Sequence, residues 1–248
     1  MFCPITIVMK ALILAAGKGS RINDLTDNPK CLIKFGNKSI IEHQIDSLNK
    51  IGINDIYVVT GYKADEIKKV LKNKVKYINN ELFEITGTIY STHLAKTLLY
   101  NDDFLMLYGD LILDEKILDS IKNKEGDIIL LSEDGYMENQ MYLKIKENLV
   151  EDIGLNMNVK DISGFWTCVA KLSKFGSKLI FNETEKILDD KKNIGLHFID
   201  TIVKSLIKKN IKIKAYSNKN NPWYNINSLE DLEYAKKNIF PLLNLDKY

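Results

Sequence analysis

A short segment near the start of the chain, Gly17-Lys18-Gly19-Ser20-Arg21, combines small and cationic residues. Glycine permits backbone conformations that a Cβ forbids, and successive N–H groups in such a loop can bind an anion. Arg21 is the only arginine among 35 lysine and arginine residues. Because a guanidinium donates to two phosphate oxygens at once, whereas an ammonium is a compact point charge, this segment indicates phosphate recognition.

The spacing of the glycines disfavours two familiar nucleotide-binding loops. A Walker A motif requires Gly-Lys-Ser/Thr after four intervening residues, and Gly-x-Gly-x-x-Gly requires a third glycine where Ile22 stands. The residues before the loop, Leu12-Ile13-Leu14, are apolar and predict a buried strand. We therefore expect a strand that leads into a phosphate-binding loop of another kind.

A second segment, Asn28-Pro29-Lys30-Cys31-Leu32, places a lysine nine residues after Arg21. Together with the run Leu-Ala-Ala-Gly-Lys-Gly-Ser-Arg, it resembles the signature of the nucleotidyltransferase (NTP transferase) family. That family includes sugar-1-phosphate nucleotidylyltransferases and the cytidylyltransferases that activate phosphocholine or aminoethylphosphonate. The likeness extends more weakly to Gly109-Asp110 and to the segment from Pro222 to Leu232.

Apolar runs alternate with segments of helical periodicity, and the runs expected as strands are residues 11–15, 56–60, 104–108, 128–131 and 211–216. This alternation predicts an α/β fold with a mostly parallel, Rossmann-like sheet covered by helices, which the resemblance places in the GT-A-like nucleotidyltransferase class. Helices are expected over residues 40–51, 63–71, 88–100, 173–188, 196–209 and 229–237. A small antiparallel excursion is expected from the hairpin-like segments 140–146, 149–154 and 164–171.

The length of 248 residues suits one large domain. We expect residues 9–240 to form a single nucleotidyltransferase domain, preceded by an N-terminal extension at residues 1–8. No apolar run reaches the roughly 18 residues of a membrane span, and no signal peptide is evident, so a cytoplasmic protein without membrane insertion is expected. Lysines scattered among acids, at a net charge of +2, do not indicate nucleic acid. The sequence leaves a homo-oligomer open.

Asp110 ends an apolar run, at the sheet edge where open α/β folds bind ligands. A carboxylate there is a suitable oxygen ligand for Mg2+, although a turn or N-cap role before Asp114 is the alternative. Members of the family usually place a second acid near the C-terminal Trp-x-x-Ile motif, and Asn227 occupies that position here. We expect Asp110 and Asn227 to hold Mg2+. An equally weighted interpretation of Asn227 is a simple turn residue before Ser228.

The resemblance implies in-line transfer of a nucleotidyl group from a nucleoside triphosphate to a phosphorylated small molecule, with release of pyrophosphate. Such catalysis depends on positioning and on neutralisation of developing charge. Lys18 and Arg21 would hold the triphosphate, and Lys30 would stabilise the α-phosphate and acceptor oxygens. His43 and His197 are expected to be ordinary histidines, because the acceptor phosphate is already ionised.

The resemblance also assigns residues to the two substrates. Contacts to the nucleotide would come from Leu14, Ala15, Ala16, Gly17, Gly19, Ser20, Gly61, Tyr62, Thr86, Gly87 and Thr88. The segment Ile89-Tyr90-Ser91 is similar to that of phosphocholine-type cytidylyltransferases, which favours CTP. An amine-bearing acceptor would contact aromatic rings and a carboxylate, drawn from Tyr90, Asp110, Trp166, Asp200, Trp223 and Tyr224, with Asp161 as another source of counter-charge. Core packing explains each ring at least as well.

Three alternatives remain at this stage. The first keeps the enzyme class and changes the substrates to a sugar 1-phosphate with UTP, GTP or dTTP. A glycosyltransferase is disfavoured because the segment after Asp110 lacks the second acid of an Asp-x-Asp motif. A nucleotide-sensing regulatory subunit without turnover stays open because Asn227 departs from the family pattern.

Overall fold

The computed structural model describes residues 9–19, 28–219 and 221–243. Ser20, Arg21 and the N-terminal extension expected at residues 1–8 lie outside these ranges. None of the helices in the described part of the chain has the length and apolar character that crossing a bilayer requires.

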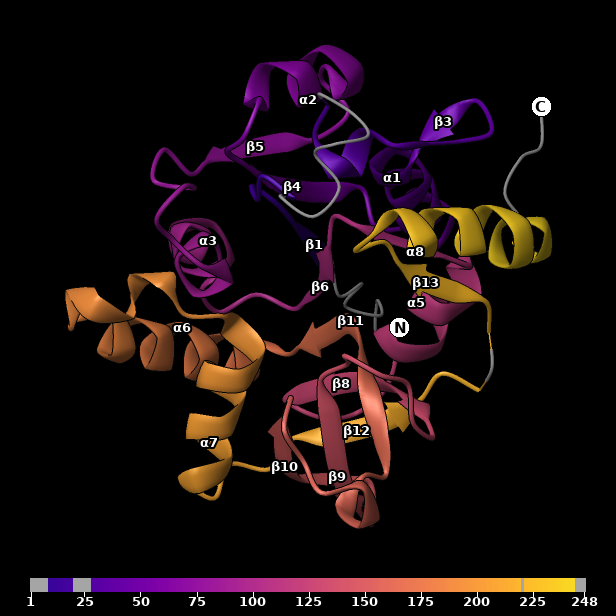
Figure 1. Cartoon of the computed structure of the whole chain (residues 1–248). Coiled ribbons are helices and arrows are strands. Elements are labelled where there is room, and N and C mark those ends of the chain that lie inside the picture. Colours follow the sequence, from indigo (N-terminus) through magenta and orange to yellow (C-terminus); the bar gives the residue numbers. More distant parts are fainter. Residues whose placement is uncertain (1–8, 20–27, 220, 244–248) are drawn as a thin grey trace, which may run out of the picture.

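Four parallel strands form one half of a nine-stranded sheet, in the order β5-β4-β1-β6 (Figure 1). Their bounds are β1 Lys10–Ala15, β4 Asp55–Thr60, β5 Lys76–Asn79 and β6 Phe104–Tyr108. Five consecutive residues of β1 are buried, as expected for a strand covered on both faces. Because β1 pairs in parallel with both β4 and β6, the carboxyl ends of these strands meet at one edge.

The other half of the sheet curls into a closed ring of strands, drawn in the lower part of Figure 1. The strand β11 pairs antiparallel with β6, and the pairing continues through β8, β12, β10 and β9 back to β11. The bounds are β8 Ile128–Asp134, β9 Tyr142–Lys146, β10 Leu149–Gly154, β11 Gly164–Leu172 and β12 Lys214–Ser217. The predicted α/β fold is confirmed, with an antiparallel part larger than the small excursion expected.

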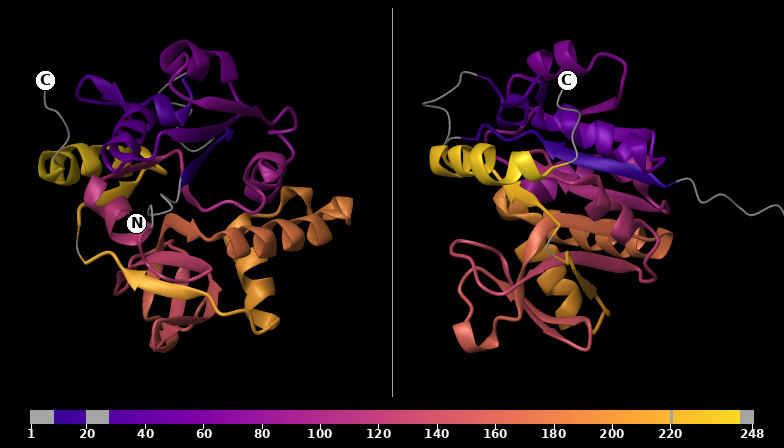
Figure 2. Two further views of the ribbon diagram at one scale, coloured as in Figure 1. Left: turned by 180° about the vertical axis from the view of Figure 1, so that it is seen from behind. Right: turned by 90° about the vertical axis from the view of Figure 1, so that its right-hand side faces the viewer.

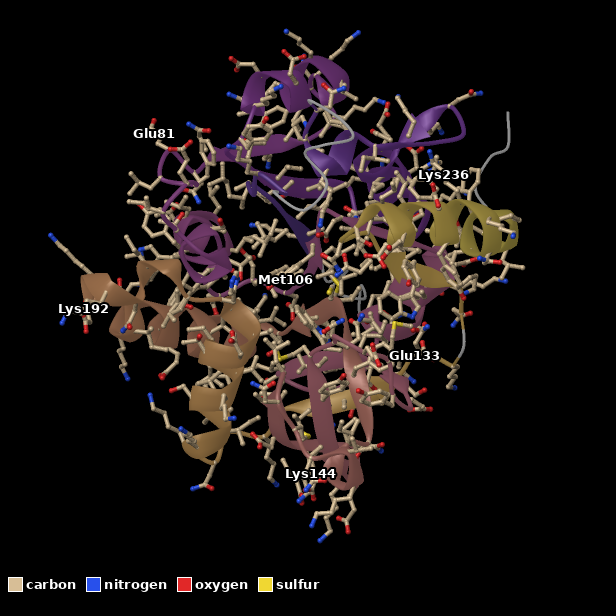
Figure 3. All side chains as sticks on the ribbon, in the orientation of Figure 1. Glu81, Met106, Glu133, Lys144, Lys192 and Lys236 are labelled. Atoms are coloured by element: carbon tan, nitrogen blue, oxygen red, sulfur yellow. The ribbon has the colours of Figure 1, made fainter. Side chains whose placement is uncertain are left out.

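Helices cover the sheet, with α1 and α5 packed together on one side and α3 and α6 packed together on the other (Figures 1 and 2). Their bounds are α1 Ile40–Lys50, α2 Ala64–Leu71, α3 Thr88–Leu94, α4 Lys96–Leu99, α5 Glu115–Lys122, α6 Lys174–Leu188, α7 Lys204–Lys208 and α8 Leu229–Tyr234. Met106 of β6 is buried between the layers, whereas Glu81, Lys192 and Lys236 point outward (Figure 3).

The predicted helix after Ser39 is confirmed, and its start has a local cause. Ser39 and Glu42 form a capping box, in which Glu42 accepts a hydrogen bond from the Ser39 backbone N–H at 2.8 Å. Ile41, Ile45 and Leu48 then recur at helical spacing and are buried. Gly52, in the left-handed region at φ 84°, follows the last turn.

Three predicted helices are shorter or less regular than expected. The segment 88–100 forms two helices, α3 and α4, and Ala95 lies between them. The segment 196–209 begins with a π-helical turn at Ile199–Val203 and becomes α-helical only in α7. Ser228 caps α8 as predicted, and a π-helical turn at Ala235–Ile239 follows. Short 3-10 turns occupy Lys30–Leu32, Val159–Asp161, Lys191–Gly195 and Phe240–Leu242.

Two small pairings outside the main sheet were not predicted. β7 (Leu111–Leu113) pairs antiparallel with β13 (Trp223–Asn225), and β2 (Lys34–Phe35) with β3 (Lys38–Ser39). A small core cluster accompanies them, formed by Ile33, Phe35, Ile40, Ile112, Ile226, Ala235 and Leu243. It joins the C-terminal segment to the region that follows the first loop.

Cys168 adopts an unusual backbone conformation in the middle of β11. Its φ is 63°, in the left-handed region, and the pairing of β11 with β8 shifts register between Trp166 and Ala170. A residue with a Cβ is strained there, and such irregularities turn a side chain away from the regular alternation of a strand.

The strain predicts an inverted order of stability for two substitutions at Cys168. Cys168→Ala keeps the Cβ and the strain, whereas Cys168→Gly removes both. We expect the glycine variant to be more stable than the alanine variant by about 1 kcal/mol, measured by urea denaturation. In a regular strand the order is the reverse, so an alanine variant of equal or greater stability would contradict this explanation.

Candidate functional site

The described part of the loop after β1, residues 16–19, begins beside the turn that follows β6. The Gly109 N–H donates to the Leu14 carbonyl at 2.9 Å, and a Cβ on Gly109 would lie 2.9 Å from the Ala15 Cβ. Gly19 has φ 66°, and a Cβ there would lie 3.4 Å from the Lys30 Cβ. Gly109 therefore allows the ends of β1 and β6 to approach closely, and Gly19 allows the left-handed backbone conformation beside Lys30.

Lys30, Asp110 and Asn227 meet at this edge of the sheet. The Lys30 Nζ donates to Asp110 Oδ2 at 2.8 Å and to Asn227 Oδ1 at 3.2 Å. The side chains of Lys30 and Asp110 are only 13% and 22% exposed. An ion pair with this much burial is screened less by solvent than a surface pair. The three residues are brought together from segments 80 and 197 positions apart.

The pairing of β7 with β13 explains how Asp110 and Asn227 become neighbours. Leu111 lies opposite Asn225 in this pairing, and the Ile226 N–H donates to the Asp110 carbonyl at 2.9 Å. Asp110 directly precedes β7, and Asn227 lies two residues after the end of β13. Asp110 thus does not cap α5, since Asp114 has that role and accepts from the Lys116 N–H at 2.9 Å.

A cavity of about 450 Å³ opens around these residues. The residues predicted for the site that line it are Leu14, Ala15, Gly17, Gly19, Lys30, Thr88, Asp110, Trp166, Asp200 and Asn227. The lining also contains residues that were not predicted, among them Cys31, Tyr108, Asn139, Gln140, Cys168 and Asn225, and it includes His197. We call this space the loop cavity.

Other predicted residues lie outside the lining of the loop cavity. The Ala16 carbonyl accepts from the Tyr62 N–H, and Gly61 lines a separate hollow beside α2. Lys18 is exposed, with its Nζ 5.9 Å from the centre of the Tyr62 ring. The ring centres of Tyr90 and His93 are 6.4 Å apart, and the Thr86 hydroxyl donates to the Leu82 carbonyl.

Gly87 and Thr88 hold the segment 194–198 against the start of α3. A Cβ on Gly87 would lie 2.0 Å from the Leu196 carbonyl oxygen, so only glycine fits without movement. The Thr88 hydroxyl oxygen accepts from the Phe198 N–H at 2.8 Å and from the Tyr108 hydroxyl at 3.2 Å. These contacts place the segment with His197 and Asp200 beside the loop cavity.

Three buried oxygens that belong to residues lining the loop cavity have no hydrogen-bond partner within the described residues. They are Asp110 Oδ1, Asp200 Oδ1 and Asn225 Oδ1. Buried polar atoms in folded proteins nearly always have partners. The cavity therefore suits a ligand that supplies positive charge or hydrogen-bond donors.

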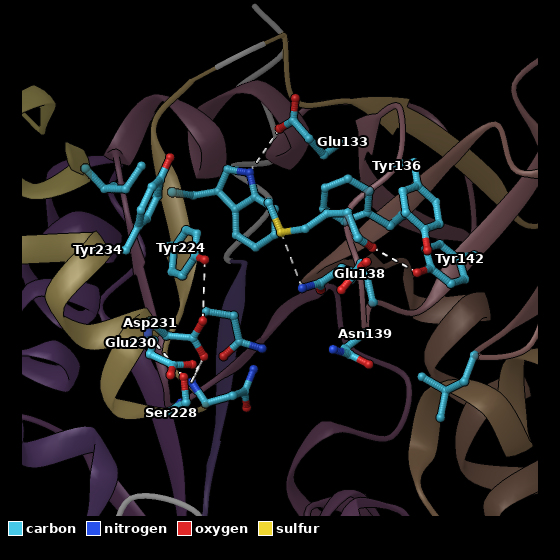
Figure 4. A pocket seen from close by; sticks show the side chains of 18 of the residues that line it. Glu133, Tyr136, Glu138, Asn139, Tyr142, Tyr224, Ser228, Glu230, Asp231 and Tyr234 are labelled. Atoms are coloured by element: carbon cyan, nitrogen blue, oxygen red, sulfur yellow. Dashed lines mark hydrogen bonds between the residues drawn. The ribbon is translucent and has the colours of Figure 1, made fainter. Parts of the chain in front are cut away.

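A larger cleft of about 1510 Å³ adjoins the loop cavity, and both are lined by Asn139, Gln140, Leu155, Asn225 and Asn227. Four acids line this cleft, namely Glu133, Glu138, Glu230 and Asp231 (Figure 4). Six aromatic residues also line it, namely Tyr136, Tyr142, Phe165, Trp223, Tyr224 and Tyr234. Among the described residues of the lining there is no lysine, arginine or histidine. We call this space the acidic cleft.

Two rings of the acidic cleft contact its acids (Figure 4). The Trp223 indole N–H donates to Glu133 Oε2 at 2.9 Å, and the Tyr224 hydroxyl lies 3.4 Å from Asp231 Oδ1. Burial, followed by the neighbouring Asp231 carboxylate, raises the pKa of Tyr224. The phenol therefore stays neutral. Trp223 and Tyr224, predicted as acceptor contacts, line this cleft and not the loop cavity.

Two free thiols, Cys31 and Cys168, line the loop cavity. Burial, reinforced by the Asp110 carboxylate, raises the pKa of Cys31 to about 12 and raises the pKa of Cys168 as well. Both sulfurs are therefore neutral near physiological pH, which argues against a nucleophilic role.

A model for the MobA-like NTP transferase domain matches residues 11–163 of the chain. The chain belongs to this family. It is 29% identical over 250 residues to the CTP:phosphoglutamine cytidylyltransferase of Campylobacter jejuni, covering 91% of this chain and 98% of that protein. The solved structure of CTP:phosphocholine cytidylyltransferase from Streptococcus pneumoniae matches with a TM-score of 0.78 at 28% identity, over 93% of this chain and 99% of that one.

A shorter match concerns the mannose-1-phosphate guanyltransferase of Aspergillus oryzae, at 37% identity over 129 residues. It covers 48% of this chain and 35% of that protein. The predicted nucleotidyltransferase family and enzyme class are thereby confirmed.

Sequence reasoning missed most of the acidic cleft. Glu133 lies near the end of β8 and Glu138 follows that strand, while Glu230 belongs to the first turn of α8, where an acid also suits the helix dipole. Each reads locally as an ordinary surface charge. The lysine-free run around Glu133 and Glu138 does not distinguish them either, because runs of the same length occur at residues 77–95 and 97–115.

The raised pKa values predict slow alkylation of both cavity thiols. In a Cys3→Ser background, we expect Cys31 and Cys168 to react with iodoacetamide much more slowly in the folded protein than in guanidinium. Because only the thiolate reacts, the rate should rise with pH and show no plateau near neutrality. Mass spectrometry of digested samples measures each site. A folded protein alkylated at either site as fast as the unfolded chain would contradict the prediction.

Proposed function

We propose that the chain transfers CMP from CTP to a phosphorylated or phosphonate acceptor that carries an amine, such as phosphocholine or 2-aminoethylphosphonate, and releases pyrophosphate. The observation that carries this proposal is the acidic cleft, with four carboxylates, six aromatic rings and no cationic side chain among its described residues. Lysines are abundant in this chain, so their absence from the cleft favours a cationic ligand. Aromatic faces and carboxylates together attract ammonium groups.

The relatives support the choice of nucleotide. The names of the proteins from C. jejuni and S. pneumoniae both include CTP, and both matches cover nearly the whole of this chain. Their acceptors differ, one being phosphoglutamine and the other phosphocholine. A sugar 1-phosphate with UTP, GTP or dTTP remains the alternative, supported by the partial match to a mannose-1-phosphate guanyltransferase.

In the proposed reaction, a phosphate or phosphonate oxygen of the acceptor attacks the α-phosphorus of CTP. A bond from that oxygen to the α-phosphorus forms, and the bond from the α-phosphorus to the oxygen leading to the β-phosphate breaks. Pyrophosphate carries away the electron pair. The acceptor oxygen is already ionised near neutral pH, so the protein needs no general base. Positioning and charge stabilisation then supply the catalysis.

Lys30 is the described cation best placed for this role. Its ammonium contacts Asp110 and Asn227 and lines the loop cavity, where it would stabilise the α-phosphate and acceptor oxygens. Leu14, Ala15, Gly17 and Gly19 line the same cavity and would contact the nucleotide. Lys18 and Arg21 would hold the triphosphate, although Arg21 lies outside the described residues. Four further residues predicted for the nucleotide do not line the cavity and would support the residues that do, namely Gly61, Tyr62, Thr86 and Gly87.

The donor set around Asp110 fits a hard divalent cation such as Mg2+. Asp110 Oδ1 is buried without a partner in the described part of the chain, and Asn227 offers a neutral amide oxygen nearby. The described residues contain no group of three or more His, Cys, Asp and Glu side chains that could hold a metal. Phosphate oxygens and water would therefore complete the coordination. Such a cation, when bound, supplies charge neutralisation on the phosphates.

Pyrophosphate release with Mg2+ tests the proposal. CTP, UTP, GTP and dTTP should each be paired with phosphocholine, 2-aminoethylphosphonate, phosphoglutamine and sugar 1-phosphates. We expect turnover with CTP and an amine-bearing acceptor, and we expect Lys30→Ala to abolish most of that turnover while the protein remains folded. Turnover only with a sugar 1-phosphate would select the alternative. Nucleotide binding without turnover on any acceptor would favour a regulatory subunit.

The acidic cleft predicts a specific kinetic defect. Glu138 and Glu230 are exposed acids, so Glu138→Gln with Glu230→Gln should remove charge with little effect on folding. We expect the KM for the acceptor to rise about tenfold, with the KM for CTP unchanged, since each exposed charge contributes a modest attraction. Glu81→Gln, an exposed acid that does not line the cleft, is the matched control. An unchanged acceptor KM would remove the cleft from acceptor binding.

A further inference from the structure

The turn between β6 and β7 carries Asp110 and is held from several directions. The Gly109 N–H donates to the Leu14 carbonyl of β1, and the Asp110 carbonyl accepts from the Ile226 N–H, each at 2.9 Å. A third attachment comes from Gln44 in α1. The Gln44 Nε2 donates to the carbonyls of Tyr108 at 2.8 Å and Leu111 at 2.7 Å.

The two carbonyls bound by Gln44 bracket the Gly109-Asp110 pair. Gln44 is 1% exposed, and its two partners lie 64 and 67 residues further along the chain. Carbonyl oxygens only accept, so the end of the amide that faces them is the NH2 group, which donates both of its hydrogens. The orientation of the amide is thus fixed by its partners.

A buried amide in the core face of α1 has a cost unless its groups are bonded. Gln44 lies next to Ile45 and three residues after Ile41, both of which are fully apolar and buried. The Gln44 Oε1 has no partner within the described residues. Packing alone would be served better by leucine or methionine at this position. The two donated hydrogen bonds are therefore the feature that glutamine supplies here.

We propose that Gln44 is a positioning residue for Asp110. It fixes the backbone on both sides of the aspartate, so that the carboxylate reaches Lys30 and the loop cavity. The catalytic part of this inference rests on the proposed nucleotidyl transfer, whereas the structural part does not. Loss of the clamp should let the turn shift and should separate the Asp110 carboxylate from Lys30.

Gln44→Met tests the clamp because methionine keeps the length and removes both donors. Ser47→Ala is the matched control, since Ser47 lies on the same helix, is 1% exposed, and its hydroxyl has no partner in the described part of the chain. Amide hydrogen exchange measured by NMR reports the turn directly. In Gln44→Met we expect the Gly109 and Ile226 N–H groups to exchange about tenfold faster, because their hydrogen bonds belong to the released turn.

Amides of β4, which β1 separates from β6 in the sheet, should change little in Gln44→Met, and neither N–H group should change in Ser47→Ala. A general loss of stability would instead accelerate β4 and the turn together. Unchanged exchange at Gly109 and Ile226, or equal acceleration throughout, would overturn the clamp. Gln44→Glu serves as a second variant should the methionine variant not fold, since a carboxylate facing two carbonyls keeps the shape and repels them.

Kinetics test the consequence for catalysis, using the substrate pair found active in the wild type. We expect Gln44→Met to lower kcat about tenfold, with the KM for CTP changed less than about threefold, because a displaced Asp110 affects the reacting groups more than nucleotide binding. Unchanged kcat with accelerated exchange would overturn the positioning role. A wild type that shows no turnover would count against the proposed function, and the exchange experiment would still decide the clamp.

Discussion

The arrangement of the candidate site depends on the hydrogen bonds that the Lys30 ammonium donates. It bonds at once to Asp110 and Asn227, which lie at the same end of the antiparallel β7–β13 pair. A half-buried cation needs opposite charge and hydrogen bonds to offset the loss of water. The Asp110 carboxylate and the Asn227 amide provide two acceptors, and the negative charge of Asp110 balances the positive charge of Lys30. A second acid in place of Asn227 would leave the group negative, as long as no metal was present.

Several backbone contacts keep this group together without contributing chemistry of their own. The pairing of β1 with β6 sets the first loop beside Asp110, and the β7–β13 pair brings Asn227 to it. The small core cluster then includes Ile112 and Ile226, each close in sequence to one of these residues. The position of a single carboxylate thus depends on contacts distributed from β1 to the C-terminal segment.

The sequence predicted the parts of the site that are determined locally. The apolar run of β1, its glycines and the Ser39 cap can each be predicted from a few residues, and the predicted strand ends placed Asp110 at the edge where the carboxyl ends of the parallel strands meet. The bend at Cys168 was not predictable, because its φ of 63° arises from the register of β11 against β8. Trp223 and Tyr224 were expected beside Trp166, yet they line the adjoining cleft, because β13 pairs with β7 outside the main sheet. Such placements are set by long-range pairing, which no local pattern encodes.

The two spaces differ in the charged groups of their described linings. The loop cavity contains the Lys30 ammonium together with the Asp110 and Asp200 carboxylates, whereas the acidic cleft holds four carboxylates and no cation. Between them lie the neutral amides of Asn139, Gln140 and Asn225, which line both spaces. An anionic group in the acidic cleft would meet four carboxylates and no described cation. A molecule with one cationic and one anionic end would therefore place its cationic end in the acidic cleft, which leaves the anionic end towards Lys30.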